Sequence, residues 1–253
     1  MPARRMPDGS GSLLGGRLAY RQAEAGHRSG IEPVLLAASV AARAGERVIE
    51  AGTGAGAALL CLAWRVPGLF AVGLDRDAAL AALAAENFRR NGFATLRAVA
   101  GDITQAPCAP VFDHAIANPP WREAAGSVSP DPGRRLARAA PAGLVEAWIR
   151  ALIGLLRPHG TLSLILPARR LGGALSAIAE AGGGDPAITP LWPREGRPAK
   201  LVILQARRGG GGDLTLRPGL VLHRACMHGA RSFTADAERI LRDGAGLPQP
   251  GPP

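Results

Sequence analysis

The feature that most constrains the fold of this chain is the alternation of short apolar runs with helical segments. The runs expected to form strands cover residues 18–21, 47–50, 69–75, 95–100, 112–117, 161–166, 187–191 and 201–206. Helical patterns begin at Gly30-Ile31-Glu32-Pro33 and also cover residues 57–65, 77–90, 141–156 and 171–181. Parallel strands need long crossovers, which are usually helices, so this order predicts an α/β fold whose mostly parallel sheet is covered on both faces.

The length and composition suit one domain of this kind. The chain has 253 residues, of which 47% are hydrophobic. We expect residues 31–208 to form the domain and residues 1–30 to be a flexible N-terminal segment. Gly209 to Gly212 predicts a break, after which residues 213–245 are expected to form a small appendage with a hairpin and a short helix. Residues 246–253 are expected to be a loose tail.

Several classes of protein are excluded by what the sequence lacks. No stretch reaches the roughly 20 uninterrupted apolar residues of a membrane span. Residues 1–8 are not followed by the apolar region of a secretory signal, so a cytoplasmic location is expected. The three cysteines, Cys61, Cys108 and Cys226, are widely separated, which predicts neither a zinc site nor a disulfide framework. We therefore expect no metal.

The basic charge is unevenly distributed along the chain. The formal net charge is +10, and Lys200 is the only lysine. Residues 31–120 hold 7 basic and 8 acidic residues, whereas residues 121–253 hold 18 and 10, and residues 1–30 hold 5 and 2. The excess therefore flanks the central segment, as a protein that binds a polyanion with its flanks would require.

A glycine-rich segment, Glu50-Ala51-Gly52-Thr53-Gly54-Ala55-Gly56, lies between an expected strand and an expected helix. Glycines at such a turn let the backbone approach a ligand, and the helix start offers unpaired N–H groups. Gly52, Gly54 and Ala57 also fit the relaxed dinucleotide-binding pattern, so a nicotinamide cofactor must be weighed.

Three carboxylates favour a different cofactor. Glu50, just before the glycines, would repel a pyrophosphate but attract the sulfonium and ammonium groups of S-adenosylmethionine. Asp75, at the end of the second core strand, can accept hydrogen bonds from ribose hydroxyls, a role shared with dinucleotide enzymes. Asp102, after the third, can accept from an adenine amino group. Asp77 is expected to cap its helix instead.

The tetrapeptide Asn118-Pro119-Pro120-Trp121 follows the expected strand at 112–117. The side-chain oxygen of Asn118 and the backbone carbonyl of Pro119 can accept from the two N–H groups of a planar amino or amide nitrogen. Two successive prolines stiffen the turn and hold these acceptors in place. Trp121 offers a flat face on which a base can stack. The residue set predicts methyl transfer to an amino or amide nitrogen.

These motifs resemble those of class I S-adenosylmethionine-dependent methyltransferases of the Asn-Pro-Pro-aromatic group, in which the aromatic residue is usually Tyr. The segment Gly26-His27-Arg28-Ser29-Gly30, the run Glu86-Asn87 to Asn91-Gly92 and the C-terminal run Pro198 to Ile203 resemble the tRNA(Val) adenine N6-methyltransferase family. The resemblance implies a Rossmann-like fold with a seven-stranded, mostly parallel sheet and an antiparallel last strand. It also implies that residues 1–30 cap the cofactor and substrate side.

The resemblance assigns roles by position. The catalytic set is Asn118, Pro119, Pro120 and Trp121. The cofactor-binding set is Arg28, Glu50, Gly52, Thr53, Gly54, Gly56, Asp75, Arg76, Asp102 and Ile103. The implied cofactor is S-adenosylmethionine, the implied partner is tRNA, and the chain is expected to act as a monomer in which residues 122–140 form a mobile loop.

Other functions stay open from the sequence. Enzymes with this tetrapeptide also methylate DNA adenine and protein glutamine amides. A nicotinamide-dependent oxidoreductase and a non-catalytic RNA-binding protein are alternatives from other classes. The first needs a hydride-transfer partner residue that is not evident in the sequence, and the second would have no use for Glu50 and Asn118.

Overall fold

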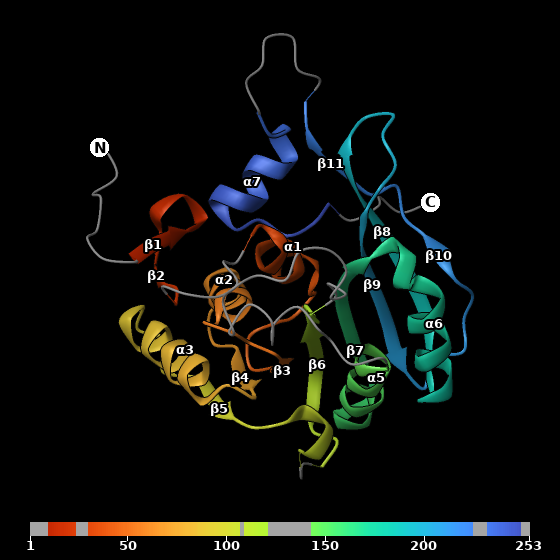
Figure 1. The fold of residues 1–253 in the computed structure, drawn as a ribbon, viewed down its shortest axis with the longest axis horizontal. Helices are drawn as coiled ribbons and strands as arrows, with labels where there is room; N and C mark the ends of the chain where they lie inside the picture. Colours follow the sequence, from red (N-terminus) through yellow and green to blue (C-terminus); the bar gives the residue numbers. More distant parts are fainter. Residues whose placement is uncertain (1–9, 24–29, 107–108, 121–142, 225–231, 249–253) are drawn as a thin grey trace, which may run out of the picture.

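The structure, a computed structural model, describes residues 10–23, 30–106, 109–120, 143–224 and 232–248 (Figure 1). Its central sheet has the strand order β10-β8-β9-β7-β6-β3-β4-β5, and β11 also pairs with β8. The strands are β3 (Arg47–Ala51), β4 (Phe70–Asp75), β5 (Leu96–Ala100), β6 (Phe112–Ala117), β7 (Leu156–Pro167), β8 (Gly183–Arg194), β9 (Leu201–Arg208), β10 (Thr215–Leu216) and β11 (Leu220–His223). Every pairing in this sheet is parallel except those of β9.

The helices lie on both faces of the sheet. They are α1 (Glu32–Ser39), α2 (Ala57–Arg65), α3 (Ala78–Arg90), α5 (Leu144–Leu155), α6 (Leu171–Glu180) and α7 (Ala235–Asp243), with short 3-10 turns η1 (Leu14–Gly16), η2 (Ile103–Gln105) and η3 (Ala168–Arg170). One core contains side chains from α1, α2, α3 and α7, and the other contains side chains from α5 and α6. The α/β fold with its antiparallel strand is thus confirmed.

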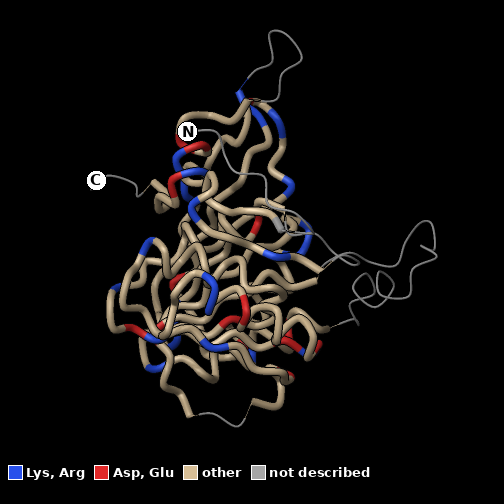
Figure 2. The backbone as a smooth tube through the Cα atoms, turned by 90° about the vertical axis from the view of Figure 1, so that its left-hand side faces the viewer, with Lys and Arg blue, Asp and Glu red and all other residues tan. Residues whose placement is uncertain are grey.

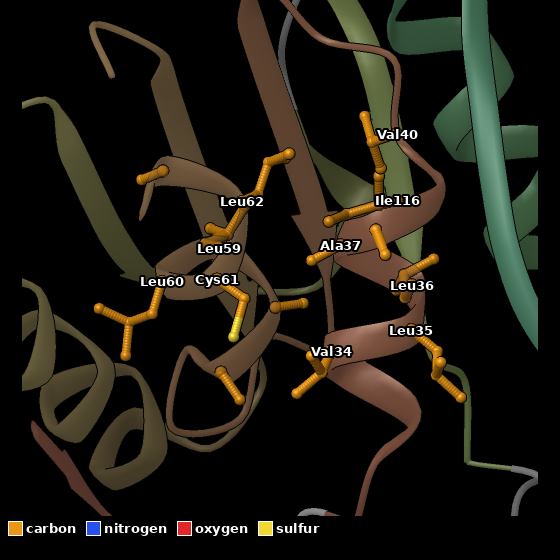
Figure 3. Close-up of a cluster of buried hydrophobic side chains, with 14 of the residues drawn as sticks. Val34, Leu35, Leu36, Ala37, Val40, Leu59, Leu60, Cys61, Leu62 and Ile116 are labelled. Carbon is orange, nitrogen blue, oxygen red and sulfur yellow. The ribbon is translucent and has the colours of Figure 1, made fainter. Parts of the chain in front are cut away.

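The two cores divide the strands residue by residue. Val48 and Ile116 belong to the first core, whereas their neighbours Ile49, Ala115 and Ala117 belong to the second, as the alternation of side chains along a strand requires. Figure 3 shows the first core, where side chains of α1 and α2 gather beside Ile116. Cys61 lies buried among them, as expected for a small apolar side chain, while Cys108 and Cys226 lie outside the described residues.

The C-terminal region differs from the expectation of a hairpin. β10 and β11 do not pair with each other but run one after the other along the outer edge of β8, both parallel to it. The backbone N–H of Arg217 donates to Ile188 at 2.8 Å and keeps the connecting residues on that edge. Leu220 and Leu222 are buried there. The expected sheet of seven strands is therefore present and is extended by two more.

The segment Pro158-His159-Gly160, whose proline and glycine are typical of a turn, lies within β7 instead. The pairing with β6 shifts register between Phe112 and His114, and His159 adopts a left-handed conformation with φ +62°. The extra residues are thus accommodated as an irregularity within the strand, which keeps its pairing on both sides.

A small antiparallel pair, β1 (Ser10–Leu13) with β2 (Leu18–Arg21), packs against α3. Asn87 on α3 and Asn91, the residue that caps its C-terminal end, each accept from a backbone N–H of β2. Each also donates to the carbonyl of the same residue, Arg21 and Ala19 respectively, and all four bonds are 2.8–3.0 Å long. Asn87 is fully buried and also donates to the carbonyl of Ala55 at 2.9 Å. One amide therefore joins the N-terminal pair to the glycine-rich turn.

Within the described residues no helix combines the length and the apolar character needed to cross a membrane.

Candidate functional site

The candidate site lies where the strand order reverses direction. From β3 the chain moves to β4 and β5 on one side of the sheet, then returns to β6 and β7 on the other. Ala51, the last residue of β3, is level with Ala117, the last residue of β6. Gly52 and Asn118 therefore leave neighbouring strands at the same height, at the kind of switch point where open α/β sheets bind ligands.

The glycine-rich turn needs its glycines for two reasons. Gly52, Gly54 and Gly56 all have positive φ, at +65°, +55° and +85°, which side chains make unfavourable. A Cβ at Gly52 would lie 2.5 Å from Cη2 of Trp148, and one at Gly56 would lie 2.5 Å from Cε1 of Phe88. The turn is thus packed closely onto α5 on one side and α3 on the other.

Gly52→Ala is expected to lower the free energy of unfolding by about 2–4 kcal/mol, from left-handed strain and overpacking. On a Trp148→Phe background, which removes Cη2, the same change should cost about 1 kcal/mol less. Gly54→Ala is the matched control, because it has positive φ but nothing within 4 Å of its Cβ. Urea unfolding of the single and double variants measures these differences, and strictly additive effects of Gly52→Ala and Trp148→Phe would refute the contact.

Glu50 is the buried carboxylate of the site. It is 4% exposed, and the hydroxyl of Thr53 donates to its Oε2 at 2.6 Å. The pKa of Glu50 is raised to about 8, chiefly by burial and also by the charge of Asp75, while the Thr53 hydrogen bond opposes the shift. A carboxylate kept in this environment is costly to ionise alone, and a cationic ligand beside it would offset that cost.

Asp75 organises the backbone around the turn. Its Oδ2 accepts from the N–H of Gly54 at 2.8 Å, and its Oδ1 accepts from the N–H of Asp77 at 3.0 Å. Each oxygen keeps a further lone pair that can accept from a ligand hydroxyl. Asp77 caps α3 by accepting from Ala79 and Leu80, as expected.

Asp102 lies at the next strand end and is paired within the protein. Its Oδ2 accepts from Arg76 at 2.7 Å, and its Oδ1 accepts from both the backbone N–H and the hydroxyl of Thr104. The Thr104 N–H and hydroxyl, together with the Arg76 guanidinium, hold the pKa of Asp102 below its usual range. Ile103 follows as a buried side chain. An adenine amino group that donates to Asp102 would do so beside Arg76 and Thr104, which already donate to it.

Asn118, Pro119 and Pro120 stand on the other side of the switch point. Asn118 is half-buried, and among the described residues none hydrogen-bonds its side-chain amide. Pro119 is buried and Pro120 half-buried. The Asn118 amide is thus not committed to holding the fold together. Trp121, Arg28 and the loop expected at 122–140 lie outside the described residues.

Two residues of the site were not expected from the sequence. Trp148 on α5 is 6% exposed and packs against Gly52, and its buried indole N–H has no hydrogen-bond partner among the described residues. Asn87 holds the carbonyl of Ala55 within the turn. The apolar periodicity of α5 marks Trp148 only as a core residue, and nothing in the sequence pairs either side chain with the turn.

A hollow of about 270 Å³ lies at the opposite edge of the sheet and is lined by Arg47, Phe70, Thr95, Arg97 and Phe112 among others. These residues lie at or near the amino ends of β3–β6, away from the glycine-rich turn. We place the site at the carboxyl ends because the turn, the buried carboxylate and the uncommitted amide converge there.

Comparisons with known proteins agree on one family. The family model described as Methyltransferase small domain matches residues 31–148. A protein of Tolumonas auensis named tRNA1(Val) (adenine(37)-N6)-methyltransferase is 34% identical over 158 residues, covering 61% of this chain and 65% of that protein. A protein of the same name from Aeromonas hydrophila is 30% identical over 183 residues, covering 71% and 76%.

The extent of the matches differs between sequence and structure. The chain spans 65% of the length of the Tolumonas auensis protein. It spans 59% of the length of a further protein of the same name, from Bacteroides thetaiotaomicron. The crystal structure of a predicted O-methyltransferase from Agrobacterium tumefaciens superimposes with a TM-score of 0.70 at 25% identity. That match covers 85% of this chain and 97% of the other, so nearly the whole fold of that protein is found in this chain.

Proposed function

This chain belongs to the methyltransferase small domain family, and on that premise we propose that it transfers a methyl group from S-adenosylmethionine to N6 of an adenine in RNA. The preferred substrate is tRNA(Val), at the adenine beside the anticodon. The observation that supports this best is that Gly52 and Asn118 leave adjacent strands at the same level. A cofactor held by the turn would therefore lie beside the amide that receives the acceptor nitrogen.

The charges of the turn fit S-adenosylmethionine better than a dinucleotide. Glu50 is buried at the strand end, and the Gly54 N–H is already bound to Asp75. A pyrophosphate needs free N–H groups and no nearby carboxylate, so the turn suits a cation. We assign Glu50 to the methionine end of the cofactor, Asp75 to its ribose hydroxyls, and Asp102 with Ile103 to its adenine. Thr53 holds Glu50, Arg76 holds Asp102, and Arg28 completes the proposed set.

The acceptor site works by holding a weak nucleophile in a reactive geometry. When bound, S-adenosylmethionine supplies an electrophilic methyl group. Asn118 Oδ1 and the Pro119 carbonyl each accept one N–H of the adenine amino group, which concentrates the nitrogen lone pair away from the ring. The nitrogen forms the new bond to carbon as the carbon–sulfur bond breaks, and its extra proton passes to solvent. Pro120 stiffens the turn, and Trp121 stacks on the base.

The competing activities require other acceptors or other cofactors. The name of the Agrobacterium protein refers to oxygen methylation, but an oxygen acceptor has at most one hydrogen for the two hydrogen-bond acceptors at Asn118 and Pro119. Methylation of DNA adenine or of a glutamine amide would use the same atoms, and the excess of basic residues outside the central segment favours a nucleic acid. We further propose that the protein is a cytoplasmic monomer. We also propose that it needs no metal, because the attacking nitrogen is neutral and is held by carbonyl groups.

Nucleoside analysis tests the function directly. Bulk tRNA is incubated with the protein and labelled S-adenosylmethionine, digested to nucleosides, and examined by mass spectrometry. We expect label in N6-methyladenosine, and Asn118→Ala protein serves as the control that should give almost none. Wild-type protein that leaves no label in N6-methyladenosine, or that labels only an oxygen of the nucleosides, would overturn the proposal.

A further inference from the structure

Six basic residues lie at or beside the strand ends on one half of the carboxyl edge of the sheet. They lie in η3 after β7, in the last residue of β8 and the β8–β9 connection, and after β11; they are Arg169, Arg170, Arg194, Arg197, Lys200 and Arg224. Glu195 is the one acidic residue in these segments. In Figure 2 several blue segments lie in the upper part of the molecule, where Figure 1 shows the β8–β9 connection and the end of β11. We call these six residues the basic row.

The row is continuous in the fold although it comes from three parts of the chain. The backbone N–H of Ala168 donates to the carbonyl of Lys200 at 3.0 Å, which joins η3 to the β8–β9 connection. His223 is level with Arg194 in the pairing of β11 with β8, which brings Arg224 beside the same connection. The row therefore crosses β7, β9, β8 and β11 in their order in space.

The row begins beside the acceptor amide. β7 is the neighbour of β6, and Ala117 is level with Leu164 in their pairing, so η3 follows one strand away from Asn118. At the usual strand spacing, the row extends roughly 20 Å from Asn118 across the sheet. Arg194, Arg197, Lys200 and Arg224 are exposed along it.

The other half of the same edge has the opposite charge. The ends of β3, β4 and β5 carry Glu50, Asp75, Asp77 and Asp102 against the single Arg76. Asn118 stands between the two halves, since β6 separates β3 from β7 in the sheet. A cation is favoured on one side of Asn118 and a polyanion on the other.

On the basis of the proposed function, we infer that the basic row binds the phosphate backbone of the RNA substrate and leads its target nucleotide to Asn118. Phosphate contacts of this kind set position rather than sequence. They also make affinity depend on salt, since each neutralised phosphate releases counterions. The row explains how a substrate can be directed to one side of the acceptor amide, away from the acidic cofactor half.

The test compares two triple variants with the same change in charge. Arg194→Ser, Arg197→Ser and Lys200→Ser together remove half of the row. Arg43→Ser, Arg47→Ser and Arg207→Ser together form the control, because these exposed residues lie toward the amino edge of the sheet and Arg207 is near the other end of β9 from Lys200. Filter binding with tRNA is measured from 50 to 400 mM salt, beside methyl transfer and binding of S-adenosylhomocysteine.

We expect the row variant to bind tRNA about 10- to 100-fold more weakly at low salt, with a slope of log affinity against log salt reduced by about 2. Its KM for tRNA should rise while its affinity for S-adenosylhomocysteine stays at the wild-type value, and the control should match the wild type. If the row variant unfolds at a lower temperature than the wild type, the double variant with Arg197→Ser and Lys200→Ser replaces it.

The outcomes separate the surface from the function. A wild-type protein that methylates no RNA refutes the proposed function. A wild-type protein that methylates RNA, beside a row variant whose tRNA affinity and salt slope equal those of the control, refutes the basic row alone. In that second case the basic row would instead be a binding surface for an acidic protein.

Discussion

Asn118→Ala is expected to lower kcat for methyl transfer by about 10²- to 10³-fold, the range seen when one preorganised hydrogen-bonding group is removed from a polar active site. No described residue hydrogen-bonds the side-chain amide of Asn118, so the substitution should leave the stability of the fold unchanged. The dissociation constant for S-adenosylhomocysteine should stay within about twofold of the wild-type value, since Glu50, Asp75 and Asp102 are unchanged. Single-turnover transfer and calorimetric binding measure the two effects separately.

A matched substitution sharpens this expectation. Asn118→Asp keeps an acceptor oxygen in the same place, so it should retain more activity than Asn118→Ala. Wild-type turnover by Asn118→Ala would show that the amide does not act on the acceptor nitrogen. Equal losses in turnover and cofactor binding would instead show that Asn118 maintains the turn.

The second large effect concerns Glu50 and pH. In the free protein burial raises the pKa of Glu50 to about 8, whereas a carboxylate facing the cofactor's cations is held ionised. Binding therefore expels a proton below pH 8, and the affinity should fall by up to about tenfold for each pH unit on the acid side. Glu50→Gln cannot ionise, so it should bind about 100-fold more weakly at pH 8 and nearly as well as the wild type at pH 6.

The ratio of the dissociation constants of Glu50→Gln and of the wild type isolates the effect of ionising Glu50. The ligand's own amino group, with an ordinary pKa near 8, titrates in both proteins and cancels from the ratio. Calorimetry at pH 6, 7 and 8, in buffers of different ionisation enthalpy, gives both the ratio and the protons released. A ratio that stays constant over this range would mean that Glu50 does not change its ionisation on binding.

The same shift affects folding without the cofactor. Because the folded pKa lies above the ordinary value of 4.5 for a glutamate, the native state holds more protons than the unfolded chain between about pH 4.5 and 8. The contribution of Glu50 to stability is therefore present at low pH and is lost as the pH rises through this window, by up to about 1.4 kcal/mol per unit. Urea unfolding of Glu50→Gln should lack this component.

Local sequence signals predicted the elements that hold the site. The strand at 112–117 and the helix at 57–65 have the predicted bounds, because each is delimited by strong breakers such as Pro119 and Gly56. The ends of β3 and β6 are apolar runs followed by glycine or proline, which is why the positions of Glu50 and Asn118 could be predicted.

Long-range packing explains what could not be predicted. Trp148 contacts Gly52 across almost a hundred residues of sequence, and Asn87 joins β2 to Ala55 through a side chain that resembles any polar helix residue. The course of β10 and β11 along β8 was also missed, because a short strand carries no signal for which edge it joins. Residues of these kinds are recognised only when the chain is folded.

The buried amide of Asn87 bears on where this domain begins. The family match starts at Ile31, yet two of the three hydrogen bonds of the Asn87 side-chain amide are made to Arg21. A chain shortened to the matched region would leave that amide short of partners inside the core, at a cost of about 1–3 kcal/mol for each unsatisfied group. Its remaining bond is to Ala55, so the loss would fall directly on the loop that is proposed to hold the cofactor.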